Sequence, residues 1–378
     1  MLDTRPGAMT PIAPGAPFAA GSNTSLGAVD PSGLPLFSAA FSGTVTVFNP
    51  ASAGVLVVYP AADSTMPNIS TINFAAGETV SAGVFAPNGF RIATNAQTDV
   101  LLDVTAEYDV AGHATFATYY YYHPLPAPVR IVDSRSVGGM IPAGTTRNVQ
   151  VGGLTVSGVT FPANVRAITG SITAITPAGN GYMTVYDPDI ALPTASQLNF
   201  PAGVTITNDI VVLTSDTATS QVAIHPSVQT NFILDVTGYF SDTLNDVNGT
   251  GTFVYPLDTP IRLLDTRGNP AYAMGARLVG GVRSAPLTGR GFTYLGTTIP
   301  NTTRALFGTL TTVNASAGGY AYIVPAGSAG PLTTTLTYGS PQARAAGFTT
   351  ALDASGQYVL LGSTATDAIL DVTALFAP

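Results

Sequence analysis

Three Asp-x-Arg triplets are the residues of this sequence whose types and spacing most readily suggest chemistry. The aspartates could bind a cation, and the arginines could hold a carboxylate on a glycan. The alternative is an internal charge-assisted hydrogen bond that fixes the chain where it enters a domain. Three copies at matching positions fit either role, and we favour the internal bond. The triplets are Asp3-Thr4-Arg5, Asp133-Ser134-Arg135 and Asp265-Thr266-Arg267.

Three further aspartates recur in a Leu-Asp-Val-Thr motif that closes each copy. Each lies among apolar neighbours in a segment expected to be a strand, and a buried carboxylate needs a partner. The arginine of the same copy's triplet is the obvious candidate. We therefore predict three ion pairs, which join Arg5 to Asp103, Arg135 to Asp235 and Arg267 to Asp371.

Nothing in the sequence singles out a catalytic centre. The histidines, His113, His123 and His225, occupy unmatched repeat positions and no metal-ligand spacing. No His-Glu-x-x-His, Gly-x-Ser-x-Gly or phosphate-loop pattern is present, and no pair of carboxylates stands out for glycoside hydrolysis. Asp187 and Asp189 offer two acids in one loop, whereas calcium takes six or more oxygens. We expect no enzyme, no metal site and no cofactor.

Four consecutive tyrosines form the boldest aromatic signal. In a strand they would face alternate sides, so at least two would face the surface. An exposed aromatic patch could stack on a sugar or anchor a partner chain. The alternative, which we favour, is a linker strand that packs between domains. The residues are Tyr119, Tyr120, Tyr121 and Tyr122.

The motifs divide the 378 residues into three copies of one unit. The triplets recur at spacings of 130 and 132 residues, and the closing motifs at 132 and 136. Such self-similarity indicates a repeat architecture. The predicted units are residues 1–110, 111–241 and 242–378. The second and third begin with similar Pro-Leu-containing segments, which we expect to form an added strand that the first unit lacks.

The elements that carry these motifs read as short strands. Ile168, Gly170 and Ile172 share one face of a predicted strand, with Thr169 and Ser171 on the other, the pattern of a half-buried strand. With 40 Gly and 29 Pro to punctuate the chain, the composition favours many strands and tight turns. We predict an all-β protein of three tandem β-sandwich or barrel-like domains of one repeat type.

Composition narrows the classes of function. The net charge is −8 and all 13 basic residues are Arg, so nucleic acid is a poor partner, because phosphate binding needs clustered cations. The absence of Cys excludes disulfides and thiolate metal sites. No apolar run approaches the roughly 20 residues that span a membrane. The N-terminus shows no signal-peptide pattern, which favours a protein that needs no export sequence.

These motifs resemble a bacterial surface repeat family that also occurs in phage-encoded proteins. Its units open with Arg-Leu-Leu-Asp-Thr-Arg, pass through a Gly-Tyr-Leu-Thr-Val strand and a Ser-x-Leu-Asn segment, and close on Asp-Val-x-Gly-Tyr-Phe. The resemblance covers nearly the whole chain and implies no catalytic residue. The matching segments here are residues 262–267, 181–185, 196–199 and 235–240.

The sequence thus predicts a non-catalytic structural protein displayed on an exterior surface, specifically a phage virion component such as a capsid decoration or minor tail protein. The alternative is a glycan-binding or adhesive module of a secreted or cell-envelope protein. Expected partners are other structural proteins of the same surface, a second copy held through an open strand edge, or glycans. Nucleic acid and membrane insertion are not expected. A rod and a compact pseudo-threefold body both remain open.

Overall fold

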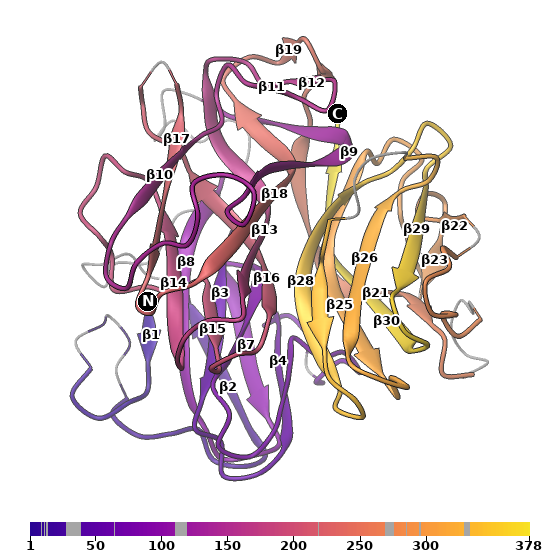
Figure 1. Cartoon of the computed structure of the whole chain (residues 1–378). Helices are drawn as coiled ribbons and strands as arrows, with labels where there is room; N and C mark the ends of the chain where they lie inside the picture. The colour runs from indigo at the N-terminus through magenta and orange to yellow at the C-terminus, as the bar shows by residue number, and fades with distance from the viewer. Residues whose placement is uncertain are drawn as a thin grey trace.

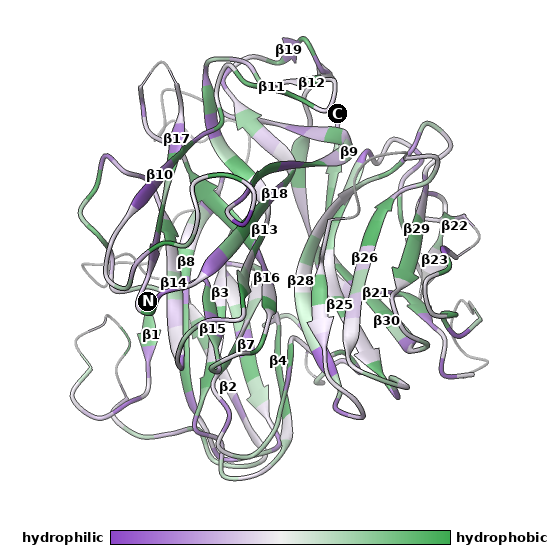
Figure 2. Ribbon diagram, in the orientation of Figure 1, coloured by the Kyte–Doolittle hydropathy of each residue, from purple (hydrophilic) through white to green (hydrophobic). Residues whose placement is uncertain are grey.

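The chain folds into β-strands in all three repeats. The computed structural model describes every residue except 9, 11, 13, 28–38, 64, 110–118, 218, 269–275, 285, 295 and 329–332. Within that part of the chain there are six four-stranded antiparallel sheets, two from each repeat, and three small hairpins. The hydrophobic residues concentrate along the strands, as Figure 2 shows. No helix among the described residues is long and apolar enough to cross a membrane.

The first repeat supplies two sheets of orders β1-β8-β3-β6 and β2-β7-β4-β5. Consecutive strands therefore alternate between the two sheets, except that β4 and β5 lie in the same sheet. The strands are β1 Leu2–Asp3, β2 Ser22–Gly27, β3 Ala40–Phe48, β4 Gly54–Pro60, β5 Ile72–Phe74, β6 Val80–Pro87, β7 Gly89–Thr94 and β8 Asp99–Tyr108.

The second repeat has the same plan, with sheets β16-β13-β18-β9 and β10-β17-β14-β15, and two extra hairpins, β11-β12 and β19-β20. The long strand β9 comes from the Pro-Leu-containing segment. The strands are β9 Tyr121–Asp133, β10 Arg147–Gln150, β11 Thr155–Val156, β12 Val159–Thr160, β13 Val165–Ile175, β14 Gly181–Tyr186, β15 Leu198–Phe200, β16 Ile206–Leu213, β17 Gln221–Pro226, β18 Asn231–Ser241, β19 Asn245–Asp246 and β20 Gly249–Thr250.

The third repeat forms sheets β21-β30-β25-β28 and β22-β29-β26-β27, with a hairpin β23-β24. Its long strand β21 is the counterpart of β9. The strands are β21 Phe253–Asp265, β22 Leu287–Thr288, β23 Thr293–Tyr294, β24 Thr297–Thr298, β25 Ala305–Val313, β26 Gly319–Pro325, β27 Leu336–Tyr338, β28 Arg344–Ala351, β29 Gln357–Gly362 and β30 Asp367–Ala377.

The six sheets are the blades of a six-bladed β-propeller, because each one turns an edge strand toward a common centre. Going around that centre, β6 packs on β5, β5 on β28, β28 on β27, β27 on β16, β16 on β15, and β15 on β6 again. The ring therefore closes through contacts between repeats as well as within them. Figure 1 shows strands from distant parts of the chain, such as β16 and β28, meeting in the middle.

The prediction of three tandem β-sandwich or barrel-like domains is therefore wrong. All-β structure is correct, but the units are not separate bodies on a string. The physical reason lies in the strand faces that we took to be turned toward solvent. Thr169, Ser171 and Thr173 on β13 are 0%, 7% and 3% exposed, because they are covered within the ring.

The two kinds of blade interface have different chemistry. Within a repeat, the facing blades bury one large apolar cluster. Between repeats, hydroxyl and amide groups contribute. The Asn199 side-chain amide donates to the Ser81 hydroxyl at 2.5 Å, and the Ser171 hydroxyl donates to the Thr334 carbonyl oxygen at 2.9 Å. Polar residues that the sequence pattern places on an exposed face thus form hydrogen bonds between the repeats.

One glycine of each repeat has a steric role. On β3, β13 and β25 it lies opposite a bulge in the neighbouring strand. A Cβ atom there would lie 2.0 Å from the carbonyl oxygen of the closing aspartate, so only glycine fits. The bulge also sets the register at that aspartate. The glycines are Gly43, Gly170 and Gly308.

At the centre, three equivalent positions are occupied by Gly83, Asp209 and Gly347. A Cβ atom on Gly347 would lie 2.8 Å from the carbonyl oxygen of Gly83, and one on Gly83 would lie 3.0 Å from the Asp209 side chain. There is room for one side chain, and Asp209 supplies it. Because this carboxyl is buried, its pKa lies well above the ordinary value, although Thr349 opposes the rise.

Aromatic rings from all three repeats pack beside this point. Tyr108 of the first repeat lies 6.1 Å from Phe240 of the second, between ring centroids. Tyr122 of the second lies 4.1 Å from Phe376 of the third, and Phe307 lies 5.4 Å from Phe85 of the first. The apolar cluster therefore links the repeats in a closed circuit.

Replacing Asp209 with asparagine should stabilise the protein at neutral pH. The folded-state pKa is raised, so the carboxyl costs stability that grows as the pH rises above its unfolded value of about 4. Asp209→Asn removes the charge, and we expect a gain on the order of 1 kcal/mol near pH 7 that shrinks as the pH falls toward about 4. Urea unfolding across this range measures it. The exposed Asp258→Asn change is the control, and equal stability of parent and Asp209→Asn protein at neutral pH would contradict the account.

Candidate functional site

The Asp-x-Arg triplets form internal ion pairs. Each arginine closes back on the aspartate two residues earlier, with Nη2–Oδ2 distances of 2.7, 2.7 and 2.6 Å in the three repeats. The arginine's backbone amide also donates to the same carboxylate. Each aspartate is thus bound by its own turn. The hydrogen bond from Arg135 holds the pKa of Asp133 below its ordinary value.

Two of the closing aspartates, Asp235 and Asp371, are held by arginines other than the ones we predicted. The Arg130 guanidinium, not that of Arg135, donates to Asp235 at 2.8 and 3.1 Å. In the third repeat Arg262, not Arg267, donates to Asp371 at 2.9 and 3.1 Å. These partners lie directly opposite each other on adjacent strands.

In the third repeat the ion pairs form a continuous chain of alternating acidic and basic side chains. Arg262 also reaches Asp265 at 3.5 Å, and Asp265 in turn binds Arg267. The side chains of Arg262 and Asp371 are 4% and 1% exposed. Burial raises the pKa of Asp371 to about 6, and the bonds from Arg262 oppose that rise. The arrangement suits a structural clamp, because both charges face each other instead of a ligand.

The first repeat departs from this plan. Asp103 was predicted to pair with Arg5, but Arg5 closes on Asp3 instead. Among the described residues, the one hydrogen bond to the Asp103 carboxylate comes from the backbone amide of Ser196 in the second repeat, at 3.3 Å. The first repeat therefore contains the acid of the clamp without its arginine.

The four tyrosines divide into two kinds. Tyr119 and Tyr120 are 41% and 45% exposed. Tyr121 packs edge-on against Phe253 of the third repeat, with ring centroids 5.5 Å apart. Tyr122 is fully buried, and its hydroxyl lies 3.0 Å from that of Thr169. One end of the run therefore anchors repeats together while the other presents aromatic rings to the surface.

A serine, a histidine and an aspartate come together in a way that the sequence analysis missed. His123 Nε2 lies 3.2 Å from the Ser241 hydroxyl, and its Nδ1 lies 3.4 Å from an Asp246 oxygen. Nε2 also lies 2.9 Å from the carbonyl oxygen of Thr243. That contact requires the proton on Nε2, so this nitrogen cannot accept one from Ser241.

The same cluster is closed to substrates. Ser241 is 0% exposed and His123 is 2% exposed, and the His123 ring stacks on Tyr239 at 5.1 Å between centroids. A nucleophile must reach its substrate, so the geometry fits a packed hydrogen-bond network better than a hydrolase triad. Of the other histidines, His225 bonds to the Thr146 hydroxyl at 3.0 Å, and His113 lies outside the described residues.

The carboxylates of the Asp187 and Asp189 loop accept hydrogen bonds from backbone amides. Asp187 accepts the backbone amide of Asp189 at 2.9 Å, and Asp189 accepts that of Asp216 at 2.8 Å. Within the described ranges no group of three or more His, Cys, Asp or Glu residues is placed to hold a metal ion.

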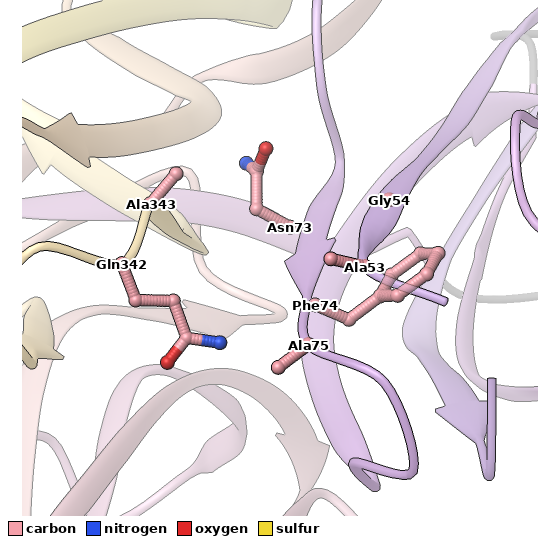
Figure 3. A pocket seen from close by; sticks show the side chains of 7 residues that line it. All are labelled: Ala53, Gly54, Asn73, Phe74, Ala75, Gln342 and Ala343. Carbon is pink, nitrogen blue, oxygen red and sulfur yellow. The ribbon is translucent and has the colours of Figure 1, made fainter. Parts of the chain in front are cut away.

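One shallow pocket lies where the first and third repeats meet, with a volume of about 350 Å³. Figure 3 shows Gln342 and Ala343 facing the β5 side across it. Beside it the Arg344 guanidinium donates to the Glu78 carboxylate, which joins the two repeats. The pocket brings together no pair of catalytic groups. Its lining is Ala53, Gly54, Asn73, Phe74, Ala75, Gln342 and Ala343.

Comparisons with known proteins add no family to this picture. No family model matches the chain, and no curated protein is similar to it at a significant level.

Truncating Arg262 should cost far more than truncating Arg135. Arg262→Ala leaves the Asp371 carboxylate buried without its partner, and we expect a loss of about 3–5 kcal/mol. Arg135 is 53% exposed at its side chain, so Arg135→Ala should cost about 1 kcal/mol or less. Denaturant unfolding of the two variants compares them. Similar losses for both would show that the buried pair is not the clamp.

Proposed function

We propose that this chain is a non-catalytic structural protein displayed on an exterior surface, specifically a component of a phage virion such as a capsid decoration or minor tail protein. The observation that carries the proposal is the use of the repeated charges. The recurring arginines and aspartates bind one another, or the neighbouring repeat, within the fold. The charged residues that recur in the three repeats thus hold the fold together instead of facing a ligand.

Two further observations support a coat or assembly role. The ring is closed at its centre by a side chain and by aromatic packing between repeats. Such a body has several outward sheet edges and loops on which neighbouring proteins can dock. The exterior location rests on the resemblance of the repeat motifs to a bacterial and phage surface repeat family.

The second candidate is a glycan-binding or adhesive module of a secreted or cell-envelope protein. It is favoured by exposed rings at and just before the starts of β9 and β21, where Tyr119 and Tyr120 are 41% and 45% exposed and Phe253 and Tyr255 are 39% and 46% exposed. Aromatic faces of this kind can stack on sugars.

Imaging the protein in its native setting tests the proposal. An antibody against the chain should label purified phage particles, and reconstruction of those particles should place propellers in a regular lattice against capsid or tail proteins. Labelling of the bacterial envelope with none on particles would overturn the virion assignment. In that case the glycan-binding candidate takes over, and the exposed tyrosines become the place to seek a ligand.

A further inference from the structure

A pocket in the third repeat is lined by two arginines that have no acidic partner in an ion pair. Its volume is about 350 Å³. None of the ion pairs among the described residues uses Arg290 or Arg304. Such a pair of cations is unexpected in a chain whose net charge is −8. The lining is Arg290, Asn301, Thr302, Arg304, Ala354 and Pro378.

Arg304 has a counterpart in the second repeat, which is Arg166. The residue after each arginine is an alanine at the same register position of β13 and β25. The Arg166 guanidinium is occupied, because it bonds to Asp216 at 2.7 Å and to Asp242 at 3.2 Å. In the second repeat this place therefore holds one cation and two carboxylates.

Both carboxylates are replaced in the third repeat. The amide that donates to the carbonyl oxygen of each arginine lies two residues before Asp216 in one repeat and two residues before Ala354 in the other. The strand pairing likewise makes Pro378 the counterpart of Asp242. Ala354 and Pro378 both line the pocket. The pocket therefore lies where the second repeat has its two acids.

A second arginine has been added at the same place. Arg290 corresponds to Gly152, since each lies two residues before the residue whose carbonyl oxygen closes the following hairpin. Its guanidinium donates to the carbonyl oxygens of Thr303 and, at 3.0 Å, Ala354. Its stem lies across Gly356, where a Cβ atom would be 2.5 Å from Arg290 Cδ. A side chain fixed in this way loses little entropy when it binds a ligand.

The two arginines also affect each other. Burial and then the charge of Arg304 lower the pKa of Arg290, and Asp353 opposes this effect. The Asp353 carboxylate accepts the Gln357 amide at 2.7 Å and forms no ion pair with either arginine among the described residues. Arg304 itself is exposed, so an anion from outside can reach it. One cation and two acids in the second repeat have thus become two cations without an acid.

We propose that this pocket binds two carboxylate groups from an acidic segment of a partner protein. These carboxylates replace the ones that Asp216 and Asp242 supply in the second repeat, and Arg290 and Arg304 both donate to them. A planar guanidinium binds a carboxylate through two parallel hydrogen bonds. Aspartate or glutamate side chains are the favoured source, because the same arginine position already binds two aspartates in the second repeat. The choice of a protein partner rests on the assembly role proposed above.

Titrating the full chain with a capped peptide that carries two aspartates tests the proposal. With ¹⁵N-labelled arginine, the Nε signals of Arg290 and Arg304 should shift and saturate, with a Kd of about 1 mM or below. The same peptide with asparagines should leave them unchanged. A chain extended by two glycines after Pro378 should bind equally, because the arginines, not the chain end, form the site.

Ala354→Asp is the sharpest variant, because it restores an internal acid at the position of Asp216. It should occupy Arg304 and weaken peptide binding by about tenfold or more, whereas the matched Ala354→Asn protein should bind like the parent. Arg304→Gln should weaken binding to the same extent. The exposed Arg135→Gln change is the control for loss of a charge elsewhere. These variants keep the hydrogen bonds of Arg290, so the test does not depend on a change that impairs folding.

Three results would overturn the proposal. They are no shift of the two arginine signals at about 20 mM peptide, equal binding by the Ala354→Asp and Ala354→Asn proteins, and tighter binding of inorganic phosphate or a galacturonate oligomer than of the peptide. The proposed function can fail separately. A protein found on the bacterial envelope would keep this site and lose the virion assignment, and a virion protein that ignores the peptide would lose only this inference.

Discussion

The close approach of three strands at the centre is the constraint on which the whole molecule depends. Strands β6, β16 and β28 meet there, and the equivalent positions hold Gly83, Asp209 and Gly347 because only one side chain fits. Because the central strand of each repeat packs against the central strands of the other two, no repeat buries that strand by itself. At this central point the three repeats differ, since one equivalent position holds an aspartate and the other two hold glycine.

Part of this fold could be predicted from the sequence and part could not. Alternation in residues such as Ile168 and Ile172 correctly indicates a strand with one apolar face. The opposite face, with Thr169 and Ser171, looks like a solvent face, but both residues are buried. Thr169 bonds to hydroxyl groups of its own repeat, and Ser171 donates to the Thr334 carbonyl oxygen of the third repeat. The alternation of polar and apolar residues shows which face of a strand is polar, but not whether that face is exposed. It therefore could not predict that the sheets close into a propeller.

The clamp shows a similar limit. The sequence correctly marks Asp235 as an acid in need of a cation, but the nearest motif arginine, Arg135, is occupied by Asp133. Antiparallel register with a bulge brings Arg130 opposite Asp235 instead. This register depends on the shift in the pairing of β9 with β18 between Leu234 and Asp235, which the sequence motifs do not specify. The buried cluster around His123 was not predicted, because the spacing of His123, Ser241 and Asp246 in the sequence matches no catalytic motif.

The central claim is that the three repeats form one cooperative closed ring. Differential scanning calorimetry of the full chain tests it most directly, by comparing the van't Hoff enthalpy with the calorimetric enthalpy. A single ring that opens as a unit predicts a ratio of about 1. Three repeats that melt independently predict a ratio of about one third, and that result would contradict the account.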